Sequence, residues 1–315
     1  MVDYLDEIVG QDTAKRFIRT AIKKENLYNF LFVGPKGVGK RLLAFALAKT
    51  LQCPPTSPNF MLVAPIPSKL KNKDDKVYEY TKQYLPEYAV VEIEDRASIL
   101  IEQIRYVIQR LIHMPSSESK RIVLILEVDK MTDEAANCFL KTLEEPPIDT
   151  IFILTTSRPH FVLPTIRSRC QIVPFHYLNN EQITSIIFDG QDEFQLGSPG
   201  EILMLRENNT IDYVYDIFKY SPLDTRTAAV KAKEFERKKT VAILYPLLLL
   251  YRLVFYKKLG IGIHTVLDEE ITRKTKSISL GDIINTLAML QYNINILEQN
   301  PNRLLLLFNT LSKLP

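Results

Sequence analysis

Cysteine and histidine are scarce in this sequence, and tryptophan is absent. The three cysteines, Cys53, Cys138 and Cys170, lie far apart, none of them forms a Cys-x-x-Cys pair, and there are only four histidines. We therefore expect neither a disulfide framework nor a zinc site rich in cysteine. Reduced thiols are typical of a cytoplasmic protein, and this is the localisation that we expect.

A long hydrophobic run is also missing. The longest, Val241 to Tyr251, contains Pro246 and is followed by Arg252, whereas a membrane span needs about 20 apolar residues. We predict that this run forms a buried helix and that the protein makes no contact with a membrane. The first residues are acidic and lack an apolar stretch, so we expect no signal peptide.

Glycine is infrequent, with 10 glycines and 18 prolines, which excludes collagen-like and low-complexity classes. The chain of 315 residues has 46% hydrophobic and 24% charged residues, as in a globular protein of about two domains. Its net charge of +3 is too small to indicate a polyanionic partner. Residues 226–315, however, hold 14 Lys and Arg against 7 Asp and Glu, a net charge of +7. Six of these bases crowd one predicted helix, either as a solvated face or as contacts for DNA phosphates: Arg226, Lys231, Lys233, Arg237, Lys238 and Lys239.

Strand-like and helix-like segments alternate in the first half of the chain. Apolar runs predict strands at 29–33, 88–93, 121–128, 150–156 and 170–174, and helical periodicity predicts helices at 42–51 and 101–112. Thr132 is expected to cap a further helix that ends near Pro146. This order predicts an α/β domain with a parallel sheet covered on both faces. The proline-rich segment from Gln52 to Tyr80 is interpreted as an irregular insertion, and helical patterns dominate from about Leu178 onward.

A glycine-rich segment follows the first predicted strand and precedes a predicted helix. It reads Gly34-Pro35-Lys36-Gly37-Val38-Gly39-Lys40, which matches a phosphate-binding loop in the required context. Gly34, Gly37 and Gly39 would let backbone N–H groups turn toward phosphate oxygens, and Lys40 would reach the terminal phosphates. The alternative is a turn that binds no nucleotide.

Two groups that hold Mg²⁺ in hydrolytic phosphate-loop proteins are missing. The loop should be followed by Ser or Thr, but Arg41 stands there, and Leu126 occupies the place of the acid expected at the end of a later strand. Glu127 follows and is a candidate to orient water. We therefore predict a phosphate loop without hydrolysis and no metal site. The alternative is that the strand is misaligned and that Asp129 is the missing acid.

Four stretches of the chain resemble one family. They are Ile8-Val9-Gly10-Gln11, the phosphate loop, the segment from Asp129 to Pro147 with its Leu-Lys-Thr-Leu-Glu-Glu-Pro-Pro ending, and Leu163 to Cys170 with the Ser-Arg-Cys motif. Together they are similar to the delta-prime subunits of the bacterial DNA polymerase III clamp loader, within the AAA+ superfamily. The likeness covers about residues 6–175, and Asn300 to Leu304 resembles a stretch near the family's C-terminus.

The resemblance implies a RecA-like AAA+ domain over residues 1–175, a helical lid over 176–222 and a helical collar over 223–315 that assembles with related subunits. The collar is expected to bury helix faces such as Leu304–Phe308. The implied partners are gamma/tau and delta subunits, with the sliding clamp and primed DNA reached through the complex. In this family the arginine of the Ser-Arg-Cys motif, here Arg169, acts in the ATP site of the neighbouring subunit. Its alternative role is an ordinary salt bridge at the end of a loop.

Departures from the ATPase members of the family favour a stator without ATPase activity of its own. The losses at Arg41 and Leu126 are joined by Glu201, which stands where ATPase relatives carry an arginine on the lid helix. Thr155 and Thr156 stand at the place of a polar sensor, or are ordinary strand-end threonines. The zinc-binding cysteines common in the family are absent, so no zinc is expected, whereas ATP or ADP is expected to bind without hydrolysis. Two alternatives stay open: an active ATPase of the gamma/tau type, and a DNA-binding AAA+ protein that works alone.

Overall fold

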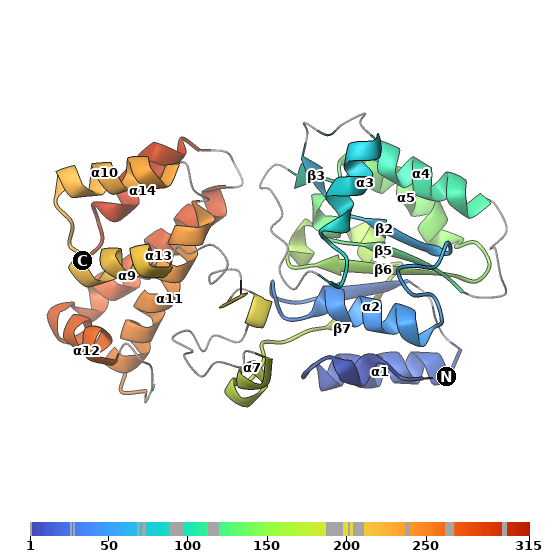
Figure 1. Cartoon of the computed structure of the whole chain (residues 1–315), viewed down its shortest axis with the longest axis horizontal. Coiled ribbons are helices and arrows are strands. Elements are labelled where there is room, and N and C mark those ends of the chain that lie inside the picture. The colour runs from blue at the N-terminus through green and yellow to red at the C-terminus, as the bar shows by residue number, and fades with distance from the viewer. Residues whose placement is uncertain are drawn as a thin grey trace. The chain divides into compact units, whose positions relative to one another are not determined.

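The computed structural model of the chain describes residues 2–25, 27, 29–67, 70, 74–87, 97–112, 120–186, 198–200, 202–203, 211–236, 240–261, 268–297 and 301–315. These residues form two compact units (Figure 1). Unit 1 comprises Met1–Ile186 and Gly197–Glu201, and unit 2 comprises Ile187–Leu196 and Ile202–Pro315. The finer division of the second part into a lid and a collar stays a prediction.

Unit 1 is built around a five-stranded sheet with the order β2-β5-β6-β1-β7, in which every neighbouring pair is parallel. The order places β1, the first strand in the sequence, between β6 and β7. Parallel neighbours of this kind need connections that cross a face of the sheet, usually as helices. The strands are β1 (Phe30–Val33), β2 (Phe60–Val63), β5 (Arg121–Ile125), β6 (Thr150–Thr156) and β7 (Gln171–Pro174), and a separate antiparallel pair joins β3 (Ile66–Pro67) to β4 (Ala97–Ser98).

Helices cover both faces of this sheet (Figure 1). One face packs against α1 (Asp12–Lys23) and α2 (Lys40–Thr50), and the other against α4 (Ile101–Ile112) and α5 (Asp133–Glu144). Alternate residues of β1 serve the two cores, with Phe30 and Phe32 on the first face and Leu31 on the second. The remaining helical elements of unit 1 are short or peripheral: η1 (Leu5–Glu7), α3 (Asp74–Lys82), η3 (Val128–Lys130), η4 (Pro159–Phe161), α6 (Pro164–Arg167) and α7 (Asn180–Ile186).

The expected sheet is confirmed, with two corrections. The strand expected at 121–128 ends at Ile125, and Val128 already belongs to η3. The segment Gln52–Tyr80 is not wholly irregular, because it contains β2, which pairs with β5 at the edge of the main sheet. The prolines that suggested an irregular segment lie outside this strand: Pro58 precedes its apolar run and Pro65 follows it, so they bound the strand rather than break it. The strand expected at 88–93 lies outside the described residues.

Unit 2 is helical in every element that the structure describes. Its helices are α9 (Ile211–Tyr220), α10 (Thr225–Glu236), α11 (Val241–Lys258), α12 (Asp268–Ser277), α13 (Leu280–Ile296) and α14 (Arg303–Leu311). The apolar run around Pro246 lies in α11, and residues such as Leu247 and Leu250 are fully buried, as expected. None of the described helices is long and apolar enough to cross a lipid bilayer.

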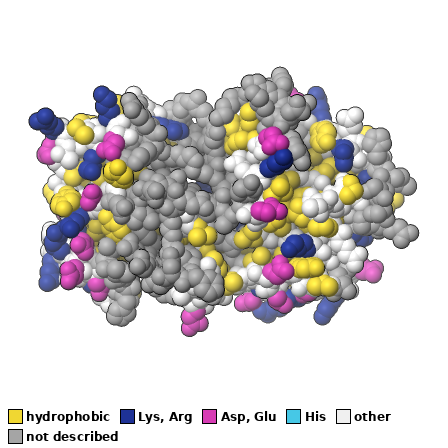
Figure 2. All heavy atoms as spheres, viewed as in Figure 1, with side chains coloured by type: hydrophobic (Ala, Val, Ile, Leu, Met, Phe, Trp, Pro, Cys, Tyr) yellow, Lys and Arg dark blue, Asp and Glu magenta, His cyan; other side chains and the backbone are white. Residues whose placement is uncertain are grey.

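The surface of unit 2 differs from expectation in one respect. In α14, Leu306 and Leu307 are buried within the chain, so the stretch Leu304–Phe308 is not a free face, and Leu305 is its well-exposed leucine. The prediction was wrong here because a run of leucines does not form one face: consecutive residues of a helix point in different directions. In α10, Arg226 and Lys233 are exposed, while residues 237–239 lie outside the described part. Acidic and basic side chains are interspersed on the described part of the face shown in Figure 2.

Candidate functional site

The segment Gly34 to Lys40 connects β1 to α2, as the sequence predicts. Gly37 and Gly39 have φ values of +72° and +97°, which L side chains rarely adopt. Gly39 is the N-cap residue of α2, so the turn leads directly into the first exposed N–H groups of that helix. The backbone therefore has the form of an anion-binding loop at a helix N-terminus.

The side chain of Lys40 is buried, and its hydrogen bonds go to its own loop and to the residue after β6. Its Nζ donates hydrogen bonds to the carbonyl oxygens of Gly34 at 2.6 Å and Pro35 at 2.5 Å, and to Ser157 Oγ at 3.0 Å. Three donors on one ammonium thus have three acceptors. To hold a nucleotide phosphate, Lys40 must exchange at least one of these oxygens for a phosphate oxygen.

Residues 198–200 of unit 1 lie directly on the phosphate loop. Ser198 Oγ donates to the Lys36 carbonyl at 2.7 Å, and the Gly200 N–H donates to the Gly37 carbonyl at 3.0 Å. A Cβ atom at Gly200 would lie 2.7 Å from Gly37 Cα, so this approach requires glycine. Glu201, expected at the position of the lid arginine, lies outside the described residues, and its proposed role stays a prediction.

Arg41, the residue after the loop, makes a structural contact. Arg41 Nη1 donates to the carbonyl oxygen of Tyr84 at 3.0 Å, beyond the end of α3, and burial lowers the pKa of the Arg41 guanidinium. Leu126, at the second position expected to hold a metal, packs into the core beneath α1 and α2. The residues at both positions therefore do not fit a resident Mg²⁺, although the loop itself fits phosphate.

Asp129, the alternative for the missing acid, is committed elsewhere. Its side chain is fully buried, accepts a hydrogen bond from Thr156 Oγ1 at 2.6 Å and forms an ion pair with Arg158 at 2.8 Å. Both carboxylate oxygens thus have protein partners, and a metal would have to compete with the half-buried guanidinium of Arg158.

Glu127 lies beside the phosphate loop, and among the described residues its carboxylate has only a weak hydrogen-bond partner. Its Oε1 is 3.5 Å from Ser157 Oγ, the hydroxyl that also accepts from Lys40. Burial, assisted by the neighbouring Asp129 carboxylate, raises the pKa of Glu127, while Lys40 acts in the opposite direction. The expected sensor threonines take other roles: Thr155 Oγ1 accepts from the Glu127 N–H at 3.1 Å, and Thr156 binds Asp129. After β6, the hydroxyl that accepts from Lys40 belongs to Ser157, which no sequence pattern singled out.

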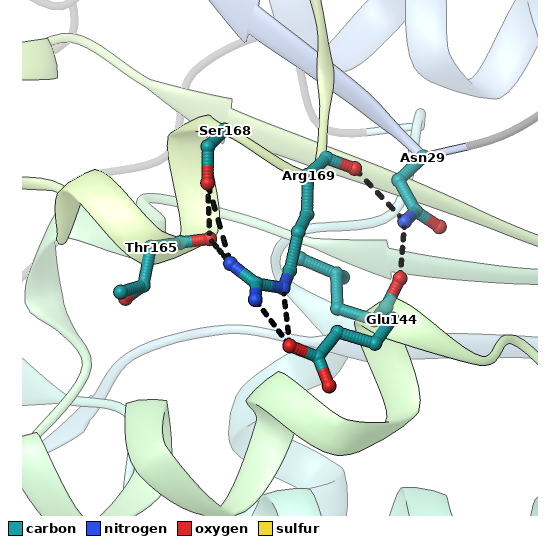
Figure 3. Close-up of polar contacts among 6 residues, drawn as sticks. Asn29, Glu144, Thr165, Ser168 and Arg169 are labelled. Carbon is teal, nitrogen blue, oxygen red and sulfur yellow. Dashed lines mark hydrogen bonds and ion pairs between the residues drawn. The ribbon is translucent and has the colours of Figure 1, made fainter.

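The Ser-Arg-Cys motif follows α6, and Figure 3 shows Ser168 and Arg169 in one cluster of polar contacts with Thr165 and Glu144. Arg169 Nε donates to Glu144 Oε1 at 2.9 Å and Nη2 donates to the same oxygen, while Nη1 donates to the Thr165 carbonyl at 2.9 Å and to Ser168 Oγ at 3.3 Å. Burial raises the pKa of Cys170 to about 12, so this thiol packs rather than reacts. Arg169 lies at the surface, with its side chain 32% exposed.

Two other recognised stretches act as connectors. Gln11 is buried, and its side-chain amide bonds the Val38 carbonyl at 3.1 Å and both backbone polar groups of His176, so the N-terminal motif ties the phosphate loop to the chain after β7. Near the other end, Asn302 caps α14 by accepting from the Leu305 N–H at 3.1 Å. Arg169 precedes β7 whereas the phosphate loop follows β1, so the two lie at opposite ends of these paired parallel strands.

Comparisons with known proteins agree with these motifs. The family model described as DNA polymerase III, delta subunit, matches residues 10–179. The DNA polymerase III subunit delta' of Bacillus subtilis is 32% identical over 174 residues, or 55% of this chain and 50% of that protein. The delta' subunit of Pseudomonas aeruginosa is 30% identical over 149 residues, or 47% and 43%. Subunit tau of B. subtilis is 31% identical over 179 residues, or 56% and 30%.

The chain thus spans half or less of the length of these curated relatives. A crystal structure of a DNA polymerase III gamma subunit-related protein from Thermotoga maritima superposes with a TM-score of 0.50 at 19% identity, covering 96% of this chain and 98% of that one. This likeness confirms the fold expected from the sequence, an α/β domain with a parallel sheet followed by a helical region. Because the family model spans more than half of the 315 residues, the chain belongs to the DNA polymerase III delta-subunit family.

Proposed function

We propose that this chain is a delta-prime-type subunit of the DNA polymerase III clamp loader, which loads the sliding clamp onto primed DNA. In this role it hydrolyses no ATP itself and supplies Arg169 to the ATP site of a neighbouring gamma/tau subunit. One observation carries the proposal. The two positions that would hold the chain's own catalytic metal are occupied by Arg41, bound to the Tyr84 carbonyl, and by Leu126, packed in the core.

The chemistry asked of Arg169 suits its side chain. A guanidinium stays charged at every physiological pH and presents a rigid fork of donors, which Lys does not. Placed against a transferring phosphoryl group, it stabilises the charge of the transition state and raises turnover by about 10³–10⁵ in systems where this has been measured. Arg169 lies at the surface beyond α6, where a neighbouring chain can reach it.

The phosphate loop has a separate proposed role. Gly34, Gly37, Gly39 and Lys40 would hold the phosphates of ADP or ATP without hydrolysis, because the backbone turn and helix N-terminus remain while the metal positions are lost. A nucleotide bound there would supply binding energy to the fold and no chemistry. The chain's own part is to exchange the carbonyl contacts of Lys40 for phosphate oxygens.

Assembly with partner subunits is proposed for unit 2. One side of α13 carries exposed apolar side chains at helical spacing, with Leu280 at 40%, Ile284 at 49% and Tyr292 at 65% exposure, and residues four apart lie on one face. Apolar side chains in such a stripe support a helix-to-helix interface with the delta and gamma/tau subunits.

Replacing Arg169 by Ala tests the central claim. In a loader reconstituted with the gamma/tau and delta subunits of the same organism, we expect turnover at the neighbouring ATP site to fall on the order of 10³-fold. Assembly of the loader, measured by size-exclusion chromatography, should be unchanged because the Arg169 side chain lies at the surface. Undiminished ATPase activity in the assembled variant would refute the role in trans.

The second candidate is an active ATPase of the gamma/tau type, favoured by the match to B. subtilis subunit tau. Magnesium-dependent turnover by the purified chain alone, lost in Lys40→Met, would establish it and overturn the stator. The stator predicts no turnover above that of the Lys40→Met control.

A further inference from the structure

The ion pair of Arg169 joins two segments that lie 25 residues apart in the sequence. Glu144 is the last residue of α5, and Arg169 follows the short helix α6. One carboxylate oxygen, Glu144 Oε1, accepts from both Nε and Nη2 of the guanidinium. Figure 3 shows the two side chains extending toward each other from these elements.

A buried amide fixes the two backbones that carry this pair. Asn29, immediately before β1 and only 4% exposed, donates through Nδ2 to the Leu143 carbonyl at 2.8 Å and to the Arg169 carbonyl at 3.1 Å. Because Leu143 adjoins Glu144, one side chain sets the separation of the acid and the base (Figure 3). The pair is therefore built into the fold, unlike a contact between two side chains on independent loops.

The pair also orients the guanidinium. Four of its five N–H donors have partners among the described residues: two on Glu144, one on the Thr165 carbonyl and one on Ser168 Oγ at the longer distance of 3.3 Å. A free arginine side chain has wide rotamer freedom, which is lost when the guanidinium is fixed in place. In this chain the plane of the guanidinium is set before a neighbouring subunit binds. The N–H group without a described partner is on Nη2, and the weakly bonded one, to Ser168 Oγ, is on Nη1.

We propose that Glu144 is the positioning residue of Arg169: its carboxylate holds the guanidinium in the orientation in which it meets the neighbour's nucleotide. The inference rests on the proposed function of Arg169 in trans. Glu144 itself touches no nucleotide and acts only through the arginine.

Replacing Glu144 by Gln removes the negative charge and keeps the size of the side chain. We expect turnover of the reconstituted loader at saturating ATP to fall by up to about fivefold, the range of an exposed ion pair. Glu145→Gln is the matched control, because the adjacent glutamate is also exposed and loses the same charge. This control should turn over ATP like the wild type.

A double variant separates positioning from a general structural effect. If Glu144 acts through Arg169, Glu144→Gln should have no further effect in the Arg169→Ala background. If Arg169→Ala alone leaves turnover intact, the proposed function fails. If Arg169→Ala abolishes turnover at the neighbouring site but Glu144→Gln equals or exceeds the wild type, the positioning role is overturned, an increase meaning that the acid holds the arginine back. An equal loss from Glu144→Gln with and without Arg169 also overturns it.

Discussion

Arg41 offers a direct test of the argument that a metal-binding position has become structural. Its Nη1 lies 3.0 Å from the Tyr84 carbonyl oxygen, within hydrogen-bonding range, whereas the Leu85 carbonyl at 3.5 Å is too distant to count fully. Tyr84 is nearly fully buried, and its hydroxyl donates to the Pro65 carbonyl at 3.3 Å. The arginine therefore holds the segment after α3 against the first turn of α2.

The expected cost of Arg41→Met follows from these contacts. A hydrogen bond from a charged donor contributes about 1.5–3 kcal/mol, and relief of the burial that lowers the Arg41 pKa offsets part of it. We expect a net loss of about 1–2 kcal/mol, since methionine keeps the apolar stem. For a domain of 150–250 residues this corresponds to a fall in Tm of about 2–8 °C.

Thermal and urea unfolding of unit 1 in the full chain would measure this change. Arg16→Met on α1 is the control, because Arg16 is exposed on a helix of the same unit, and such surface changes stay within about 0.5 kcal/mol. If Arg41→Met is as stable as the control, the guanidinium contributes nothing to the fold. The claim that structure has replaced metal binding at this position would then be wrong.

Two further predictions concern charged side chains. Titration of the chain with ADP in a calorimeter should give binding heat that Lys40→Met abolishes, and absence of heat with the wild type would contradict nucleotide binding by the loop. In unit 2, burial lowers the pKa of Lys274 to about 8 from 10.5, with Arg273 adding to the effect. Between those values the unfolded chain binds more protons, so unfolding free energy should rise with pH by up to about 1.4 kcal/mol per unit from this group. Lys274→Met should lack this slope in urea unfolding at pH 8 to 10, and an identical slope in both proteins would refute the assignment.

Local sequence patterns were sufficient to predict most strands of the sheet and the helix that Thr132 caps. The runs at Phe30, Arg121 and Thr150 are near-continuous in apolar residues because both faces of a parallel sheet are buried. The cap at Thr132 follows from a hydroxyl that accepts from the Ala135 N–H at 3.2 Å. The strand β2 was missed because neighbouring prolines outweighed four apolar residues.

The environment of the site could not be predicted in the same way. The pairing of Glu144 with Arg169, the amide of Asn29 between them and the contact of Ser157 with Lys40 join residues 25, 140 and 117 positions apart. No spacing rule reaches across such distances, because the sheet order decides which strand ends meet. The Ser-Arg-Cys motif identified the arginine, but only the fold identifies what orients it.

The loop Gly34–Lys40 shows how the proposed phosphate-binding segment is held in place within the chain itself. A buried carbonyl group without a hydrogen-bond partner is costly. The carbonyl groups of the loop therefore need donors even when no nucleotide is bound. Here Lys40 bonds the carbonyls of Gly34 and Pro35, while Ser198 and Gly200 bond those of Lys36 and Gly37. The loop is thus satisfied by its own chain and joins the sheet to residues 198–200. A substitution that removes Lys40 would therefore disturb this junction as well as the proposed phosphate binding. The loop thus has a structural role even in a subunit whose proposed contribution to catalysis is Arg169.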